Sequence, residues 1–420
     1  MWTIAVTVLV TLFVVVVAMN FHTPEKKLQH RMEHLYGIVD SQLKREMGAL
    51  LGPAIVSGNR ITALQNGDEI FPAMLEAIRR AQRTITFETY IYWSGTIGEQ
   101  FADALVERAR AGIKVHVMLD WLGSKKMEPQ LLNEMREAGI EVERYHELRW
   151  YNLGKMNNRT HRKVLIVDGT VGFTGGVGIA DQWTGRAQDP KHWRDIHFRV
   201  QGPVVAQMQA AFLDNWIKTT GSILHGDAYF PVLTASGEQE MHLVTSSPAG
   251  GSASMRLMYL TAITAAERSI DIEAAYFVPD TLMSDELIRA RARGVRIRIL
   301  LPDKHIDSET VRIASKRAWG PLLEGGVEIH EYEPTMLHCK MLIFDQHMVS
   351  VGSTNFDMRS FELNDEASLN VYDSKFALQM TDIFEQDLRL STPYTRQRWQ
   401  NRSWMQKVAE VVVIPIKAQL

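Results

Sequence analysis

One spacing of reactive side chains, His-x-Lys-x-x-x-x-Asp, occurs twice in this chain, each time inside an apolar run that is typical of a β-strand. The copies are His161, Lys163 and Asp168, then His338, Lys340 and Asp345. Because side chains alternate along a strand, a His and a Lys two positions apart share one face and can meet one anionic group. The Asp, an odd number of positions away, would face the other way at about 23 Å. The pattern therefore predicts a site of two His and two Lys, with each Asp structural unless a bulge redirects it.

Two imidazoles on opposite sides of a phosphorus atom suit a double displacement. One would attack and form a phosphohistidine, and the other would protonate the departing alkoxide and then deprotonate an acceptor alcohol or water. The lysines would supply fixed positive charge to a phosphodiester oxygen. The sequence has no His, Asp and Glu cluster at metal-ligand spacing, so we expect neither a metal nor another cofactor.

Further polar and small residues follow each motif at matching positions. Asp195 and Glu366 could each orient an imidazole, or could be solvated acids. The small-residue turns at 175–178 and 352–355 could hold phosphate oxygens on backbone amides, or could be plain tight turns. The predicted phosphate-binding residues are Gly175, Gly176, Ser353 and Asn355.

Composition and charge set limits on the function. The chain has 420 residues, 45% hydrophobic and 23% charged, which is ordinary globular composition with room for two domains. A net charge of −3 gives no bulk electrostatic reason to expect nucleic acid as a partner. The single cysteine, Cys339, rules out an internal disulfide and a cysteine-based metal site, and we expect a buried structural thiol there.

The first 21 residues carry no charged side chain and would form a helix about 30 Å long, which matches a bilayer core. They predict a transmembrane anchor. A cleaved signal peptide is the alternative, because small residues near the end resemble a cleavage site, although no basic segment precedes them. Basic residues follow immediately at Lys26, Lys27 and Arg31, so the positive-inside rule puts the catalytic domains in the cytoplasm, with the periplasm as the alternative.

The rest of the chain repeats itself at long period. Residues 74–88 match 259–273 as a helix that leads into a strand, and residues 109–115 match 291–297 as a helix closed by Gly before a strand. Helix and strand alternate in both halves, which favours an α/β fold in which each half is a mainly parallel mixed sheet flanked by helices. Such a long period indicates a duplicated domain, and a pseudo-two-fold axis would bring the two motifs together in a cleft.

The expected organisation is therefore an anchor at 1–21, a juxtamembrane helix at 22–58, a first domain at 59–218, a linker at 219–251, a second domain at 252–392 and a C-terminal amphipathic segment at 393–420. In that last segment Trp and Val side chains alternate with Arg and Lys, as in a helix lying at a membrane interface. The alternative is a helix docked on the protein's own core.

The two motifs resemble the paired HKD motifs of the phospholipase D superfamily, over about residues 60 to 390. Four stretches, 87–92, 158–163, 351–357 and 363–366, are similar to the bacterial cardiolipin synthase branch. The resemblance implies two phospholipase D-like domains and transfer of a phosphatidyl group from one phosphatidylglycerol to another, with release of glycerol and without a metal. It also implies that Asp168 and Asp345 count with the catalytic motif, and that His161 is the nucleophile and His338 the general acid and base.

The resemblance is incomplete at two places. The branch usually has Asn in the turn after its first motif, where this chain has Gly178, so one phosphate contact is missing. Many such synthases also have two hydrophobic spans, and this chain has one.

The expected partners are a phospholipid substrate, phosphatidylglycerol, and the bacterial inner membrane, with no nucleic acid and a possible homo-oligomer. Phosphatidylethanolamine is an alternative acceptor lipid. One rival function is hydrolysis, with water as the acceptor, of phospholipid or less plausibly of nucleic acid. Another is a membrane-tethered scaffold without activity, which the intact His and Lys in both halves argue against.

Overall fold

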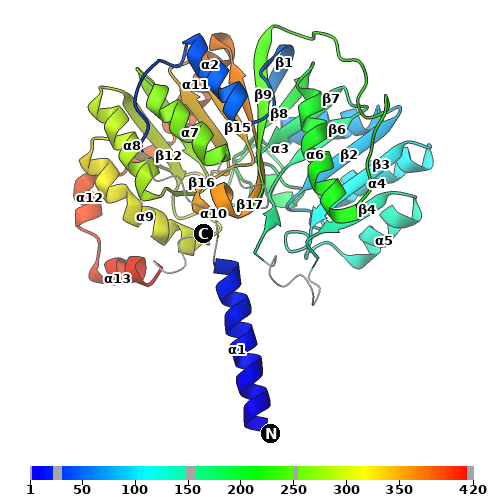
Figure 1. Cartoon of the computed structure of the whole chain (residues 1–420), viewed down its shortest axis with the longest axis horizontal. Coiled ribbons are helices and arrows are strands. Elements are labelled where there is room, and N and C mark those ends of the chain that lie inside the picture. Colours follow the sequence, from blue (N-terminus) through cyan, green and yellow to red (C-terminus); the bar gives the residue numbers. More distant parts are fainter. Residues whose placement is uncertain (1, 22–30, 148–156, 249–253, 414–420) are drawn as a thin grey trace.

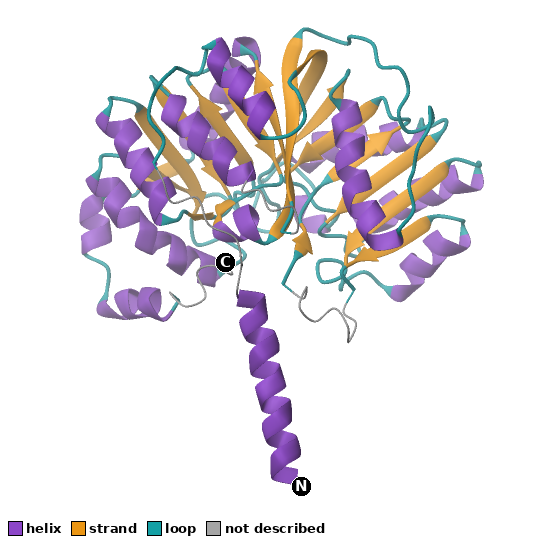
Figure 2. Cartoon of the chain, viewed as in Figure 1, coloured by secondary structure: helices purple, strands orange, loops and turns teal. Residues whose placement is uncertain are grey.

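A mixed β-sheet of 16 strands runs through the body of the computed structural model, which describes residues 2–21, 31–147, 157–248 and 254–413 (Figure 1). Helices cover both faces of the sheet (Figure 2). Before the sheet come α1 (Trp2–Phe21) and α2 (Ser41–Leu50).

The first half contains β1 (Val56–Gln65), α3 (Asn66–Arg79), β2 (Thr84–Thr89), α4 (Thr96–Arg110), β3 (Lys114–Asp120), α5 (Pro129–Glu137), β4 (Glu141–Tyr145), β5 (Arg159–Thr160), β6 (Val164–Val167), β7 (Val171–Gly175), the 3-10 helix η2 (Asp181–Trp183), β8 (Ile196–Gln201) and α6 (Val205–Thr220).

The second half contains β9 (Gln239–Ser246), α7 (Ser254–Ala265), β10 (Ser269–Ala274), β11 (Phe277–Val278), α8 (Thr281–Ala292), β12 (Arg296–Pro302), α9 (Glu309–Glu324), β13 (Glu328–Tyr332), β14 (Lys340–Phe344), β15 (Met348–Gly352), β16 (Phe356–Asp357), α10 (Met358–Glu362), β17 (Asn364–Tyr372), α11 (Ser374–Leu388), β18 (Ser391–Pro393), α12 (Arg396–Gln400) and α13 (Trp404–Val412).

The strand order is the same in both halves when it is read outward from the centre of the sheet. The first half runs β1-β8-β7-β6-β2-β3-β4, and the second runs β9-β17-β15-β14-β10-β12-β13 before ending at β18. The strands β1 and β9 pair with each other, so the sheet continues from one half into the other. A pseudo-two-fold axis between β1 and β9 would generate this order, and that axis stays a prediction. Residues 239–246 of the predicted linker form β9 itself.

The expectation of a mixed sheet flanked by helices is confirmed, but the sheet is not mainly parallel, because most of its strand pairs are antiparallel. Parallel pairing holds for β2-β3-β4 and β10-β12-β13, and for the short pairs β5-β17 and β11-β16. Two of the antiparallel pairs are hairpins: a turn with Asp168 and Gly169 links β6 to β7, and a turn with Asp345 and Gln346 links β14 to β15, and all four residues have positive φ. Asp-Gly between two apolar runs is itself a hairpin signal in the sequence.

Three large apolar clusters form most of the core, and a fourth, small one lies around Val311. One belongs to the first half and one to the second, and the third contains strand and helix residues from both. In that shared cluster Phe198 of β8 meets Phe376 of α11 edge to face, with ring centroids 6.1 Å apart. The two halves are therefore joined by a continuous sheet and by a common core, which fixes their relative position.

The N-terminal helix α1 projects away from the body (Figure 1), and the side chains described for it, those of residues 2–15, are exposed. Within the described residues, no helix has both the length and the apolar character needed to cross a membrane, so the predicted anchor is not confirmed.

The predicted juxtamembrane helix is shorter than expected, and its residues 22–30 lie outside the described residues. Helix α2 begins only at Ser41, because the side chain of Asp40 caps it by accepting from the amide of Gln42 at 2.8 Å. Leu43 and Met47 on α2 are buried in the core of the second half. This helix thus packs on the protein itself.

The C-terminal segment is docked on the protein in part, and a role at a membrane interface stays a prediction. Trp399 of α12 packs on α9, where its indole nitrogen donates to the carbonyl of Lys316 at 2.8 Å. Helix α13 is held by an ion pair between Arg402 and the buried Glu410 at 2.7 Å. Its apolar side chains nevertheless stay exposed, and these are Trp404, Met405, Val408, Val411 and Val412.

Candidate active site

Each motif histidine lies where the chain leaves one half of the molecule for the other. Strand β5 pairs in parallel with β17 of the second half, and the amide of His161 continues that pairing by donating to Asp365 O at 2.8 Å. Strand β6 then starts at Val164 in its own half. Similarly, the amide of His338 donates to Arg194 O at 2.7 Å before β14 begins at Lys340. The histidines therefore precede the strands rather than lying inside them, which corrects the expectation from the apolar runs.

A buried acid from the opposite half orients each imidazole. Nδ1 of His161 lies 2.9 and 3.0 Å from the two carboxylate oxygens of Glu366, and Nδ1 of His338 lies 2.8 Å from Oδ2 of Asp195. The carboxylates contact Nδ1 of each ring. Nε2 is therefore the ring nitrogen that can react with the substrate. The predicted acids are thus brought to the predicted histidines, each from the other half of the sequence.

Further contacts hold the two acids. Glu366 accepts from Ser353 Oγ at 2.6 Å and from Nδ2 of Asn364 at 3.1 Å, whereas Asp195 accepts from the indole nitrogen of Trp183 at 3.0 Å. Burial raises the pKa of Asp195 to about 6, even though Lys340 acts against this. Burial also acts to raise the pKa of Glu366, but His161, together with Lys163 and Ser353, holds it below its ordinary value.

The two lysines are buried and turn back toward the histidines. Nζ of Lys163 donates to His161 O at 3.0 Å. Nζ of Lys340 lies 2.6 Å from His338 O and 3.1 Å from both ring nitrogens of His338. Burial lowers the pKa of Lys163 to about 7, and the charge of Lys340 adds to this effect. A phosphodiester anion between the two ammonium groups would offset their repulsion.

Burial favours the neutral form of both imidazoles. Burial lowers the pKa of His161 to about 4, although the carboxylate of Glu366 opposes the shift. Burial lowers the pKa of His338 well below its ordinary value, and the charge of Lys340 lowers it further. A neutral Nε2 has a lone pair for attack on phosphorus, and a bound anion would favour protonation of the second ring.

A cavity of about 620 Å³ joins the two histidines. Residues of both halves line it, and they are Tyr90, Ile91, Trp93, Lys126, Arg159, His161, Lys163, Gln182, Trp183, Trp193, Tyr276, Asp307, Ser308, Val311, His338, Asn355, Asp357, Arg359, Ser360 and Asn364. The ring of Tyr90 meets His161 edge to face at 5.2 Å, and the ring of Trp183 meets His338 in the same way at 5.2 Å.

The two motif aspartates are not brought to this cavity. The carboxylate of Asp168 accepts from the amides of Gln82, Arg83 and Thr84 at 2.7 to 3.1 Å. Asp345 does the same for the three amides that precede β10, those of residues 267–269, at 2.7 to 2.9 Å. Strand alternation predicted this structural place, and the geometry does not support a catalytic one.

Of the four predicted phosphate-binding residues, only Asn355 lines the cavity. The amides of Gly176 and Ser353 are bonded to strand carbonyls, at 3.4 and 2.9 Å, and so are not turned toward a phosphate. Gly176 instead allows the carboxylate of Asp195 to lie close to the backbone, since a Cβ there would lie 2.2 Å from Oδ1 of Asp195. Gly175 precedes it at the end of β7 and does not line the cavity either.

The position of Gly178 has no room for the Asn that the resemblance leads one to expect. A Cβ there would lie 2.9 Å from Cβ of Ile91 and 3.3 Å from the ring of Trp183. The indole that holds Asp195 thus fills the space, and this half of the site lacks a counterpart of Asn355.

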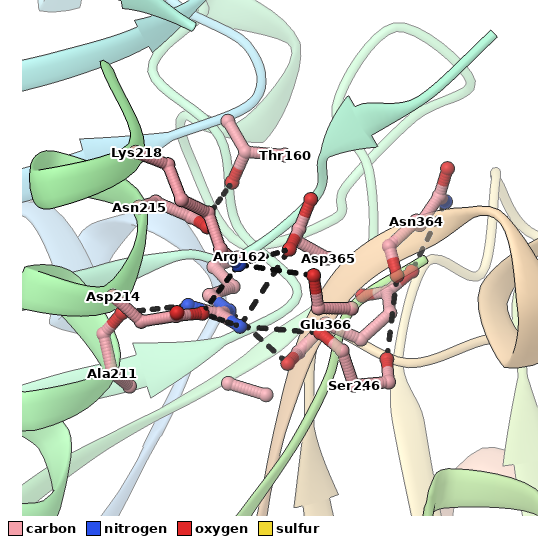
Figure 3. Close-up of polar contacts among 12 residues, drawn as sticks. Thr160, Arg162, Ala211, Asp214, Asn215, Lys218, Ser246, Asn364, Asp365 and Glu366 are labelled. Atoms are coloured by element: carbon pink, nitrogen blue, oxygen red, sulfur yellow. Dashed lines mark hydrogen bonds and ion pairs between the residues drawn. The ribbon is translucent and has the colours of Figure 1, made fainter. Parts of the chain in front are cut away.

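Arg162, between His161 and Lys163, forms hydrogen bonds to residues of both halves (Figure 3). Its guanidinium donates to Ala211 O at 2.6 Å, to Asp214 at 3.0 Å and to Ser246 O at 3.1 Å, and Nε donates to Glu366 O at 3.3 Å. Its charge is thus balanced by acids and carbonyls, which keeps the backbone of Glu366 close to the first motif.

The sequence reasoning missed several residues of the site. Asn364 and Trp193 lie two positions before Glu366 and Asp195, so the period of a strand could have found them. Tyr90 and Arg159 lie inside stretches that resemble the family, but no local pattern gave a role in the site to them, to Trp183 or to Arg359. Among the described residues, no group of three His, Cys, Asp or Glu side chains could hold a metal ion.

Comparison with known proteins agrees with this geometry. The family model described as cardiolipin synthase, PLD-like domain, matches residues 74–216 and 259–388. Cardiolipin synthase 2 of Bacillus anthracis is 34% identical over 350 residues, which cover 83% of this chain and 68% of that protein. The cardiolipin synthase of Geobacillus thermodenitrificans is 33% identical over 357 residues, which cover 84% and 71%.

Among solved structures, phosphatidylserine synthase of Haemophilus influenzae superposes with a TM-score of 0.67 at 12% identity, and covers 90% of this chain and 100% of that one. This likeness shows the fold alone. From the two matches of the family model and the identity to its curated members, the chain belongs to the cardiolipin synthase family of phospholipase D-like enzymes.

Proposed function

We propose that this protein is a phosphatidyltransferase that makes cardiolipin from two molecules of phosphatidylglycerol and releases glycerol. The observation that supports it most is the pair of imidazoles that share one cavity, each with Nδ1 on a buried carboxylate of the opposite half. A single-histidine site could bind a phosphodiester, but it could not supply both a nucleophile and a separate proton carrier.

In the first half-reaction, Nε2 of one histidine attacks the phosphorus of the donor lipid. The P–N bond forms and the bond from phosphorus to the glycerol oxygen breaks. The second imidazole, protonated on Nε2 when the anionic lipid is bound, gives that proton to the alkoxide, which leaves as glycerol. Following the family resemblance, we assign the attack to His161 and the proton transfer to His338. The ammonium groups of Lys163 and Lys340 would stabilise the charge that builds on the phosphoryl oxygens.

In the second half-reaction, the hydroxyl of another phosphatidylglycerol gives its proton to the same neutral imidazole. Its oxygen attacks phosphorus as the P–N bond breaks, so the first imidazole leaves and cardiolipin forms. The carboxylates of Glu366 and Asp195 would hold each ring in the tautomer with the proton on Nδ1, which keeps Nε2 free for chemistry.

We also propose that the protein works at the inner membrane of a bacterium, with its catalytic domains in the cytoplasm. Three features support this: the uncharged sequence of residues 1–21, the basic residues that follow it, and the exposed apolar side chains of α13, such as Trp404 and Val408. In Figure 1, α13 lies at the end of the body from which α1 projects, so both could meet one bilayer.

The test is synthesis by the purified full-length chain in phosphatidylglycerol vesicles. We expect cardiolipin and glycerol in equal amounts, and no cardiolipin from His161→Ala or His338→Ala, each checked for folding by circular dichroism. His225→Ala is the matched control, because His225 is exposed and does not line the cavity. Near-normal synthesis by either active-site variant contradicts the two-imidazole mechanism, and phosphatidic acid as the only product would make the enzyme a hydrolase.

A further inference from the structure

Three basic side chains lie on one face of the segment that carries the first motif. Arg159, His161 and Lys163 all line the cavity, at alternate positions, whereas Thr160 and Arg162 between them point into the interior. Arg159 is not part of the His-Lys pattern, and the mechanism above does not use it.

The environment of Arg159 differs from that of Arg162 although both are buried. Arg162 is surrounded by the carboxylates of Asp214 and Asp365, which raise the pKa of its guanidinium despite the opposing effect of burial. Arg159 is only 8% exposed, yet it forms no ion pair with a carboxylate of the described residues. Its Nε has no partner, and the nearby Asp120 is already bonded to the backbone amides of residues 122, 123 and 160.

A second guanidinium reinforces this charge. Arg359 lines the same cavity and donates to the side chain and carbonyl of Asn157 at 3.1 and 3.0 Å. Burial lowers the pKa of Arg159, and the nearby positive charge of Arg359 lowers it further, although Asp120 opposes both. Arg159 is buried and Arg359 is half-buried, and a buried charge beside a like charge is costly unless an anion joins them, so this flank of the cavity is complementary to an anionic group.

The two arginines have no counterparts in the second half-site, although the two half-sites otherwise match. The position of Arg159, two residues before the first His, is taken by Met336 in the second motif. The position of Arg359, four residues after Asn355, is taken by Gln182 after Gly178. Around His338 the cavity has indoles instead, those of Trp183 and Trp193 at 5.2 and 5.5 Å. A site for one phosphodiester between two equal halves would not require this asymmetry.

We propose that Arg159 and Arg359 bind the phosphate of the acceptor lipid, and so select a phospholipid over a neutral alcohol. This inference rests on the proposed function, in which the acceptor carries a phosphodiester of its own. In the product, six bonds of about 1.5 Å separate the two phosphorus atoms, which puts them roughly 7 Å apart. Arg159 lies two residues from His161, at about 6.6 Å along an extended segment, so the two spacings agree. A guanidinium suits this task because it can donate two parallel hydrogen bonds to a phosphate.

The experiment compares two acceptors in one preparation of the full-length enzyme in phosphatidylglycerol vesicles. Cardiolipin formation uses the charged acceptor, whereas incorporation of labelled glycerol into phosphatidylglycerol uses the same donor with a neutral one. We expect Arg159→Gln to lower cardiolipin formation relative to glycerol exchange by about tenfold, as the loss of one charge-assisted contact implies. Arg159→Lys should recover part of the ratio. Arg317→Gln, which removes an exposed charge on α9 away from the cavity, should leave it unchanged.

Arg359→Gln gives the same measurement from the other side of the proposed subsite if Arg159→Gln does not fold. Equal loss of both reactions, or no change in their ratio, would overturn the inference. A wild-type enzyme that exchanges glycerol but makes no cardiolipin overturns the proposed function instead, because that result is read before any arginine is changed.

Discussion

Replacement of the motif aspartates tests whether they are structural. The carboxylate of Asp168 receives three backbone amides and sits at a φ of +54°, which Asn tolerates better than Ala does. A hydrogen bond to a charged group contributes about 1.5–3 kcal/mol, roughly twice a neutral one. Asp168→Asn keeps one acceptor oxygen, so we expect about 2 kcal/mol of lost stability. Asp168→Ala also incurs the left-handed backbone cost, so we expect about 4 kcal/mol.

Asp345 provides the matched comparison in the second half. It receives three amides in the same way at a φ of +52°, but it is only 2% exposed, so water cannot replace the lost contacts. We therefore expect Asp345→Asn to lose more stability than Asp168→Asn.

The assay is urea unfolding of the full-length variants, followed by the rate of cardiolipin synthesis below the unfolding transition. We expect kcat of Asp168→Asn within a few-fold of wild type, because the carboxylate lies outside the cavity. A folded variant with unchanged stability and a hundredfold loss of kcat would refute the structural interpretation.

Three further outcomes follow from the site. Glu366→Gln should lower kcat about a hundredfold without changing the KM for phosphatidylglycerol, because it removes the charge that orients one imidazole; an equal effect on KM would contradict this. Because the pKa of Lys163 lies near 7, its charge is present below that pH and lost above it. The KM for phosphatidylglycerol should then rise about tenfold per pH unit above pH 7, and a flat profile from pH 6 to 9 would contradict that role. Gly176→Ala should push Asp195 off its histidine and lower kcat, whereas Gly48→Ala, whose Cβ would meet only the backbone nitrogen of Ile55 at 3.9 Å, should be neutral in the same assay.

Much of the site could be predicted because it depends on local geometry. The period of an extended chain placed each His and Lys on one face and turned Asp168 and Asp345 away from them, and both expectations hold in the structure. The phosphate role expected of Gly176 and Ser353 could not be judged from the sequence, because a small-residue turn looks the same there whether its amides are free or hydrogen-bonded. In the structure both amides are hydrogen-bonded to strand carbonyls.

The sheet was only partly predictable. Alternating helices and strands identified the parallel strands of each half. The hairpin at Asp168 and Gly169 was missed, because Asp168 was considered as a member of the chemical motif and not as a turn residue. Pairing of β1 with β9 depends on contacts between the two halves, which no local pattern encodes.

By itself, the sequence determined that two equivalent His-Lys pairs and two acids exist, because their spacing and repetition are properties of the chain. Only the tertiary structure decided that the partners are exchanged, so that Glu366 orients His161 across 205 positions and Asp195 orients His338 across 143. The physical reason is that β5 leaves its own half to pair with β17, which delivers the acid of one half to the imidazole of the other. A contact between distant segments is fixed by strand pairing and shared core packing, and neither can be read from spacing along the chain.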